Sequence, residues 1–360
     1  MSLLEVTSLV VACIPILIYL IVLSSERGMK ERSGVEEEML PMVSILISVR
    51  NESTNLRRLC VSLQELNYPT DKFEILIGDD GSDDDSLAIL SEYAQSHWRI
   101  FSYHHDVYGK QQTLKKMYQE AKGDMLLFTD ADMSIPSGWV STMLRGVDEG
   151  KVLQLGLTKV RETGWFSVFQ SIDWVSNQLL IKWLSDRGMF LTAWGNNMCL
   201  SKSTLEAVRF ESLPDSVVED VSLMRTMIRL GGEVRVNDDV EAIAITQAEI
   251  SFKSVIQQRM RWLQGVVELP IRYSLLAFVK ILFLPLVLFL SFYQPVWLLL
   301  ILAKALVLTL LLYKNQLLNL SFNRFVSICF IDLYEVAIYF SSFALHVLPV
   351  KFEWKGRKYR

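Results

Sequence analysis

Long apolar segments near both ends of the chain enclose a central part in which short apolar runs alternate with polar ones. Residues 6–23 carry no charged side chain, and an apolar helix of about 20 residues can cross a bilayer core of about 30 Å. A cleaved signal peptide fits poorly, because no basic residue precedes this run and no small-residue cleavage site follows it. The pattern predicts a transmembrane helix within residues 1–25.

Three further apolar segments follow the central part, at residues 275–293, 295–313 and 325–347. Each has the length and composition of a membrane helix. They predict a C-terminal membrane region over residues 271–350, followed by a basic tail at residues 351–360.

Four charged residues interrupt these apolar segments. Lys280 and Lys304 can extend along their helices and place the ammonium group at the bilayer surface. Asp332 and Glu335 lie near the middle of the last segment, where a carboxylate is costly in lipid. The last segment is therefore the weakest of the predicted crossings.

Basic residues set the expected orientation. Arg27, Lys30 and Arg32 follow the first apolar run, whereas residues 1–8 carry no positive charge, so the positive-inside rule places the central part in the cytoplasm. Three C-terminal crossings would put the basic tail on the other side, against the same rule. The last segment is either a re-entrant or interfacial hairpin, which we favour, or an exception to the rule.

The central part, residues 40–250, has the pattern of an α/β domain. Near-continuous apolar runs of the kind found in strands buried on both faces occupy residues 43–48, 73–78 and 124–130. Segments with helical periodicity separate them, among them residues 53–66, 86–95 and 111–121. Alternation of strand and helix predicts a mainly parallel sheet.

Composition narrows the classes of function. About half of the 360 residues are apolar and the formal net charge is −4, which fits a protein that is partly in lipid. Four cysteines occur without CxxC spacing, so neither a disulfide framework nor a zinc site is indicated. No basic stripe with interleaved aromatic residues precedes the last ten residues, so nucleic acid is not an expected partner.

Polar clusters follow each of the three predicted strands. They are Arg50-Asn51-Glu52, Asp79-Asp80-Gly81-Ser82 and Asp130-Ala131-Asp132. In an open α/β sheet, ligands bind beyond the carboxyl ends of the strands. We therefore expect these clusters to converge on one ligand.

Paired carboxylates suit a divalent cation. Mg²⁺ commonly takes one or two protein carboxylates and completes its shell with water and phosphate oxygens, so Asp130 and Asp132 can hold a metal-bridged diphosphate. The acidic run at residues 79–85 also has a plain interpretation as a solvated turn. An EF-hand does not fit, because the loop lacks glycine at its sixth position and glutamate at its twelfth.

Two later segments add candidate groups. Glu219-Asp220 opens a segment with helical periodicity, where carboxylates are favoured by the helix dipole whether or not they have a further role. Residues 251–270 form a predicted amphipathic helix, which can act as a basic interfacial anchor. Within it, Gln258, Arg261 and Trp262 can donate to phosphate oxygens.

The motifs DDGS, DAD, ED and Q-x-x-R-W, in this order and ahead of apolar segments, resemble the family 2 glycosyltransferases of GT-A fold, including ceramide glucosyltransferase-like enzymes and cellulose and hyaluronan synthase-like enzymes. The resemblance covers roughly residues 40–265. It implies a nucleotide-diphospho-sugar transferase domain with a Rossmann-like mixed sheet, and a divalent cation, Mg²⁺ or Mn²⁺.

The resemblance also implies roles for donor-site residues. Glu52 resembles the acidic residue near the nucleotide base, and Asp79 or Asp80 the aspartate that contacts uridine. Lys110 resembles the lysine of the family's G-K-x-x-x-L segment. Asp130 and Asp132 resemble the ribose- and metal-binding pair, with Asp132 the direct metal ligand.

The resemblance assigns the transfer step to residues later in the chain. Asp220 resembles the general base, with a pKa raised by Glu219 and by partial burial. Gln258 and Arg261 resemble the residues that hold the diphosphate, while Trp262 and Glu219 would border the acceptor. Val218 replaces the threonine found before this Glu-Asp pair in cellulose synthase-like members, which weakens assignment to processive synthases.

The expected function is inverting transfer of a sugar from a nucleotide diphosphate, a UDP-sugar, to a hydroxyl of a lipid or glycan at a bacterial inner membrane. Tryptophans at 165, 174, 183 and 194 suit a lipid acceptor reached from the bilayer, or else are core aromatics. The alternatives are a processive polysaccharide synthase and a non-catalytic membrane protein that binds sugar nucleotides.

Overall fold

The structure is a computed structural model. It describes residues 2–25, 40–103, 109–147, 150–216, 218–267, 271–319 and 321–348, and the backbone of 352–354 and 357–359. Arg27, Lys30 and Arg32, on which the expected orientation depends, lie outside the described residues.

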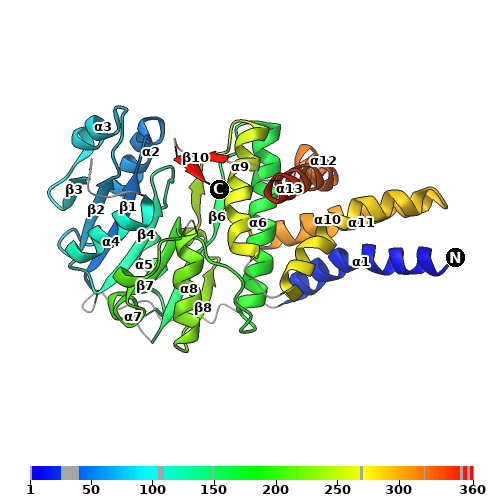
Figure 1. Ribbon diagram of the computed structural model, residues 1–360, viewed down its shortest axis with the longest axis horizontal. Helices are drawn as coiled ribbons and strands as arrows, with labels where there is room; N and C mark the ends of the chain where they lie inside the picture. The colour runs from blue at the N-terminus through cyan, green and yellow to red at the C-terminus, as the bar shows by residue number, and fades with distance from the viewer. Residues whose placement is uncertain are drawn as a thin grey trace. The chain divides into compact units, whose positions relative to one another are not determined.

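The chain forms two compact units (Figure 1). The helical unit comprises residues 1–28, 159–184 and 248–360, and the sheet unit comprises residues 29–158 and 185–247. Residues 159–184, which the sequence places inside the central domain, group with the apolar ends of the chain. The predicted domain boundaries stay a prediction.

A seven-stranded sheet forms the centre of the sheet unit, in the order β3-β2-β1-β4-β7-β5-β8. β1 pairs in parallel with β2 and β4, and β2 in parallel with β3. β7 runs antiparallel to both β4 and β5, so the sheet is mixed. The strands are β1 (Val43–Val49), β2 (Phe73–Asp79), β3 (Trp98–Ser102), β4 (Met125–Asp130), β5 (Val152–Gly156), β7 (Asn197–Ser201) and β8 (Glu233–Asn237).

Short helices accompany these strands. They are α2 (Ser53–Gln64), α3 (Ser86–Tyr93), α4 (Lys110–Glu120), α5 (Trp139–Leu144), α7 (Lys202–Ala207) and α8 (Glu219–Arg229), with 3₁₀ turns at Phe210–Ser212 and Val240–Ala242. The short strands β6 (Thr158–Val160) and β9 (Ala244–Thr246) complete the set.

The central strands are held by burial of both faces. Ile45 and Ile47 of β1 belong to a core cluster with Leu56 and Leu59 of α2. Leu46, which points to the opposite face of the sheet, is also fully buried. Continuous apolar runs therefore form these strands because neither face meets water.

The three predicted strands and the three predicted helices of this unit are present within about two residues of their expected bounds, as β1, β2, β4, α2, α3 and α4. Hydrophobic patterning did not identify β3, β5, β7 or β8. β8 alternates polar and apolar residues, and β3 is only partly buried. Such short strands give a weak signal until the neighbouring strands are placed.

The helical unit consists mainly of long helices. They are α1 (Leu3–Ser24), α6 (Trp165–Ser185), α9 (Phe252–Val267), α10 (Ile271–Ser291), α11 (Leu299–Lys314, preceded by a 3₁₀ turn at Pro295–Leu298), α12 (Phe322–Cys329) and α13 (Ile331–Val347). α1 packs against α10 and α11, while α13 packs against α9 and α10. The backbone of the tail contains strands β10 (Phe352–Trp354) and β11 (Arg357–Tyr359).

Among the described residues, two helices are long and apolar enough to cross a membrane, Leu3–Ser24 and Pro295–Lys314. They match the apolar runs predicted at 6–23 and 295–313. α12 and α13 meet at a bend of 44°, which fits a broken span or a re-entrant loop. The described apolar part of α10, Phe278–Ser291, is shorter than these spans.

Charged residues on these helices form buried ion pairs. Lys304 of α11 pairs with Asp332 of α13, and the ammonium of Lys280 lies 2.7 Å from the carboxylate of Glu335. The prediction that the two lysines extend to the bilayer surface is wrong. The carboxylates judged costly in lipid are the partners that hold these lysines inside the unit.

Candidate active site

The predicted polar clusters lie at one edge of the sheet. β1, β2 and β4 run parallel, so their carboxyl ends, and the residues that follow, lie at the same edge. β7 runs antiparallel to β4, so its first residue, Asn197, lies opposite Thr129 near the end of β4. Residues immediately before β7 therefore reach the same edge.

The loops after β1 and β2 are bonded to each other. The guanidinium of Arg50 donates to the carbonyl of Asp80 over 2.6 Å, and the backbone N–H of Glu52 donates to the Ser86 hydroxyl over 2.9 Å. The carboxylate of Glu52, a buried residue, accepts a 2.7 Å hydrogen bond from the side chain of Asn55. These contacts fix the predicted base-binding loop on the neighbouring strand.

Asp79 and Asp80 are both buried and both accept backbone hydrogen bonds. Asp79 accepts from the N–H of Ser82 at 3.2 Å, which shapes the turn after β2. Asp80 accepts from the N–H of Gly109 at 3.1 Å. Gly109 has a φ of +97°, a conformation that favours glycine, and it is followed directly by Lys110 at the start of α4.

Lys110 joins the strand-end carboxylates to the later Glu-Asp pair. Its ammonium lies 2.7 Å from Asp130 Oδ1 and 3.0 Å from Glu219 Oε1. Burial alone would lower the pKa of Lys110, but the charges of Asp130, Glu219 and Asp220 outweigh it and raise the pKa. The lysine therefore stays cationic at the centre of the carboxylates.

Asp220 lies in the first turn of α8, as the sequence predicts. Its Oδ2 accepts from the N–H of Gly195 and its Oδ1 from the N–H of Val221, both at 2.8 Å. Burial and the charge of Glu219 raise the pKa of Asp220 to about 6, against the opposing effects of Lys110 and the two N–H donors. A carboxylate with this pKa is ionised at neutral pH and basic enough to accept a proton.

Gly195 is a part of the site that sequence reasoning missed. A side chain at this position would come within about 3.6 Å of both Asp220 Oδ2 and Lys110 Nζ. Gly195 therefore lies next to the proposed base and the lysine, at an ordinary van der Waals distance from both. A single glycine in a loop carries no signal of this role, which depends on the antiparallel course of β7.

Asp132 is oriented by residues that the sequence did not single out. The hydroxyl of Thr246 donates to Asp132 Oδ2 over 2.9 Å, and the guanidinium of Arg58 donates to the Asp132 carbonyl over 3.1 Å. No group of three or more His, Cys, Asp or Glu side chains that could hold a metal occurs among the described residues. The donor set of Asp130 and Asp132 fits a cation completed by phosphate and water, and not an all-protein cage.

Gln258, Arg261 and Trp262 lie on α9 in the helical unit. The Gln258 side chain contacts Arg259 and Glu249, and Trp262 contacts Trp174 of α6 at a centroid distance of 5.1 Å. The participation of these three residues in the site at the sheet edge stays a prediction.

The tryptophans predicted near an acceptor have different surroundings. Trp174 packs inside the helical unit against Trp262, and Trp194 donates to the carbonyl of Gly156 over 2.8 Å in the sheet unit. Trp183 donates to the hydroxyl of Ser25 over 2.9 Å. Trp165 is 74% exposed, so it alone of the four has the surface position expected of an interfacial aromatic.

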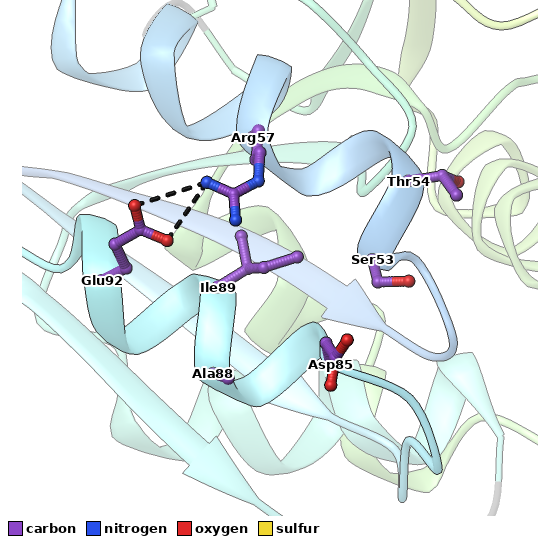
Figure 2. A pocket seen from close by; sticks show the side chains of 7 residues that line it. All are labelled: Ser53, Thr54, Arg57, Asp85, Ala88, Ile89 and Glu92. Atoms are coloured by element: carbon purple, nitrogen blue, oxygen red, sulfur yellow. Dashed lines mark hydrogen bonds and ion pairs between the residues drawn. The ribbon is translucent and has the colours of Figure 1, made fainter.

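A cavity of about 410 Å³ lies elsewhere in the sheet unit, beside α2 and α3 (Figure 2). Its lining residues are Ser53, Thr54, Arg57, Asp85, Ala88, Ile89 and Glu92. Arg57 and Glu92 form an exposed ion pair across it at 3.1 Å. None of the residues predicted to act in catalysis lines this cavity.

The chain is similar to a known protein family and to individual glycosyltransferases. Residues 44–206 match the family model described as glycosyl transferase family 2. The probable glycosyltransferase YdaM of Bacillus subtilis is 25% identical over 250 residues, 66% of this chain and 57% of that protein. The undecaprenyl-phosphate 4-deoxy-4-formamido-L-arabinose transferase of Edwardsiella ictaluri is 25% identical over 191 residues, 50% of this chain and 59% of that protein. The chain thus spans little more than half the length of these relatives.

A solved structure shares the fold. The mannosyltransferase PcManGT from Pyrobaculum calidifontis, in complex with GDP-Man and Mn²⁺, superposes with a TM-score of 0.61 at 15% identity. The match covers 95% of this chain and 99% of that chain. The likeness therefore extends over the helices as well as the sheet.

Proposed function

We propose that this protein moves a sugar from a nucleotide diphosphate, a UDP-sugar, to a hydroxyl of a lipid or lipid-linked acceptor. The proposal starts from the match of residues 44–206 to the glycosyl transferase family 2 model and from the GT-A fold. The observation that carries the proposal is the meeting of Lys110, Asp130, Glu219 and Asp220 at the carboxyl edge of the sheet.

The donor would lie along this edge. Glu52, Asp79 and Asp80 would contact the nucleoside, and Asp130 the ribose. Lys110, together with Gln258 and Arg261 of α9, would hold the diphosphate, because ammonium, amide and guanidinium groups donate strong hydrogen bonds to phosphate oxygens. The bonds that tie Glu52 and Asp80 to neighbouring loops support a rigid base pocket.

Asp132 and Asp130 would hold a divalent cation, Mg²⁺ or Mn²⁺. The Thr246 hydroxyl bonded to Asp132 supports this assignment, since metal-binding carboxylates are commonly oriented by such a contact. When bound, the cation would neutralise negative charge on the leaving diphosphate.

Asp220 would act as the general base. The acceptor hydroxyl would attack the anomeric carbon on the face opposite the diphosphate, its proton would pass to Asp220, and the electrons of the broken C–O bond would leave with the phosphate. One such displacement inverts the anomeric centre. The charge of Lys110 would stabilise the departing diphosphate, and Glu219 and Trp262 would border the acceptor.

The helices long enough to cross a membrane support an acceptor in lipid. The Edwardsiella relative is named for undecaprenyl phosphate, a lipid, and this chain would likewise use a lipid or lipid-linked acceptor. We place the protein in a bacterial inner membrane with the sheet unit in the cytoplasm.

The proposal is tested by incubating membranes that contain the protein with a panel of nucleotide sugars, Mg²⁺ or Mn²⁺ and extracted lipids, followed by mass spectrometry of the lipid phase. We expect one donor to add a single hexose mass to a lipid, absent from membranes that lack the protein. Long water-soluble polymer would indicate a processive synthase. Nucleotide binding without any transfer would indicate a non-catalytic protein.

A further inference from the structure

A buried ion pair contacts the segment of α9 that contains the proposed diphosphate-binding residues. Arg259, between Gln258 and Arg261 in sequence, places its guanidinium 2.7 Å from the carboxylate of Asp173 on α6. Both side chains are about 1% exposed. Burying two charges costs desolvation energy that their attraction does not always recover, so stability alone does not account for the pair.

Arg259 fixes the orientation of the Gln258 amide. Its second guanidinium arm donates to Gln258 Oε1 over 2.7 Å. Because a guanidinium contains only donors, the amide must turn its oxygen towards Arg259 and both N–H groups away from it. One of these N–H groups faces Glu249 at 3.3 Å. Neighbouring residues on a helix normally point apart, so this contact depends on the anchoring of Arg259.

Arg259 also lies over Trp262, three residues further along α9. The guanidinium carbon is 4.1 Å from the ring centroid, within the range of a cation–π contact. Trp174 of α6 meets Trp262 edge to face, at 64° between the ring planes. The indole therefore contacts both the guanidinium and a second aromatic ring.

Asp173 is held in turn by groups on three helices. The hydroxyl of Tyr339 on α13 donates to it over 2.9 Å, and the amide of Asn177 on α6 donates over 2.9 Å. Lys280 of α10 lies 3.8 Å away. The carboxylate that anchors Arg259 is thus fixed by the apolar helices of the same unit.

We propose that Asp173 and Arg259 form a positioning pair, which orients the Gln258 amide for its role at the donor diphosphate and holds the ring of Trp262 for its role at the acceptor. The inference rests on the proposed function, in which Gln258 and Trp262 serve the donor and acceptor. Neither Asp173 nor Arg259 would touch substrate, because both are buried.

The test compares nucleoside diphosphate and monophosphate binding by the full-length protein in detergent. The probes are UDP and UMP, and GDP and GMP, each with Mn²⁺, measured by calorimetry. The dissociation constant of the monophosphate divided by that of the diphosphate isolates the contribution of the β-phosphate. Arg259→Lys keeps a charge beside Asp173 but loses the arm that reaches Gln258, so we expect the ratio to fall at least tenfold with the melting temperature little changed.

Two tyrosines of α13 provide a matched pair of variants. Tyr339→Phe removes the hydroxyl that donates to Asp173, and we expect a severalfold lower ratio. Tyr334→Phe removes a buried hydroxyl that makes no hydrogen bond within the part of the chain that the structure describes, so the wild-type ratio should remain.

Gln258→Ala tests the assigned role of Gln258 separately from the positioning pair. If Gln258→Ala lowers the ratio while Arg259→Lys and Tyr339→Phe keep the wild-type value, the positioning pair is wrong and the proposed function stands. If Gln258→Ala also keeps the wild-type ratio, the assigned role of Gln258 fails, and the positioning pair fails with it.

Discussion

At the scale of single residues, Lys110 organises the site through its charge. Its ammonium is shared by Asp130 and Glu219, and it opposes the rise in the pKa of Asp220 that burial and Glu219 cause. The balance leaves one carboxylate whose protonation changes just below neutral pH. The sequence alone indicated that the strand-end carboxylates belong to a site, because charged groups directly after a buried strand require partners.

The pKa of Asp220 predicts an acid limb in the pH dependence of activity. Since the base must be ionised and its pKa is about 6, kcat/KM should fall about tenfold per pH unit below pH 6 and level off above pH 7. Release of nucleoside diphosphate between pH 5 and 8 measures this. In Glu219→Gln, the loss of a neighbouring negative charge should move the acid limb to lower pH. A rate that is constant from pH 5 to 8 would exclude Asp220 as the base.

Thr246 gives a second prediction for single residues. Thr246→Val removes the hydroxyl that orients Asp132, so the Mn²⁺ concentration for half-maximal activity should rise about tenfold, the usual cost of losing such a contact. Thr226→Val is the control, because the Thr226 hydroxyl bonds within its own helix to the carbonyl of Ser222. Equal metal dependence in both variants would remove Thr246 from the metal site.

At the scale of elements, the predictable strands were those whose burial is uniform. β1, β2 and β4 are buried on both faces and read directly as apolar runs. Gly195, two residues before β7, reaches the site only because β7 runs antiparallel between β4 and β5, and a five-residue run does not reveal the direction of a strand. Contacts of Thr246 and Arg259 depend on such long-range pairing, so the local sequence gave no sign of them.

The loop before α3 also departs from its expected capping. The spacing of Ser82 and Asp85 suggests a capping box, but neither caps the helix. The Asp84 carboxylate instead accepts from the N–H groups of Ser86 and Ser53, both at 3.0 Å. One side chain thus secures the starts of both α3 and α2.

Asp84→Ala should therefore lower the free energy of unfolding by about 1 kcal/mol at pH 7, the typical value of a lost helix cap. Burial alone would raise the pKa of Asp84, but hydrogen bonds from Ser86 and Ser53 outweigh it and lower the pKa from 3.8 to about 2. Because the folded-state pKa is depressed, the stabilisation is present above pH 4 and lost as the pH falls towards 2. Denaturant titration of both proteins at pH 7 and pH 3 checks this; a difference that grows in acid would contradict it.

At the scale of the whole molecule, the helical unit combines membrane-type helices with paired charges. Apolar runs alone predicted the helices, but pattern within one segment cannot reveal that Lys304 and Asp332 meet, because their pairing depends on how α11 and α13 pack. Considered alone, Asp332 was expected to be costly in lipid, and Lys304 was expected to reach the bilayer surface. Together they tie two helices to one another.

Removal of one member of this pair should be far more harmful than removal of both. Lys304→Met leaves the Asp332 carboxylate buried without its partner and should cost about 3–5 kcal/mol, whereas Lys304→Met with Asp332→Leu should recover most of that loss. Thermal unfolding in detergent measures the difference. Thr309→Val on the same helix, where the hydroxyl bonds only to the Ala305 carbonyl among the described contacts, should change little. A harmless Lys304→Met would show that the pair does not stabilise the unit.

The central claim is that the residues at the carboxyl edge of the sheet catalyse sugar transfer, with Asp220 as the general base. The most direct measurement compares wild type and Asp220→Asn for donor-nucleotide binding and for the rate of sugar transfer in the same preparation. We predict that Asp220→Asn binds the nucleotide within about twofold of wild type while transfer falls by at least a factor of about 10². Transfer at the wild-type rate by Asp220→Asn would contradict the account.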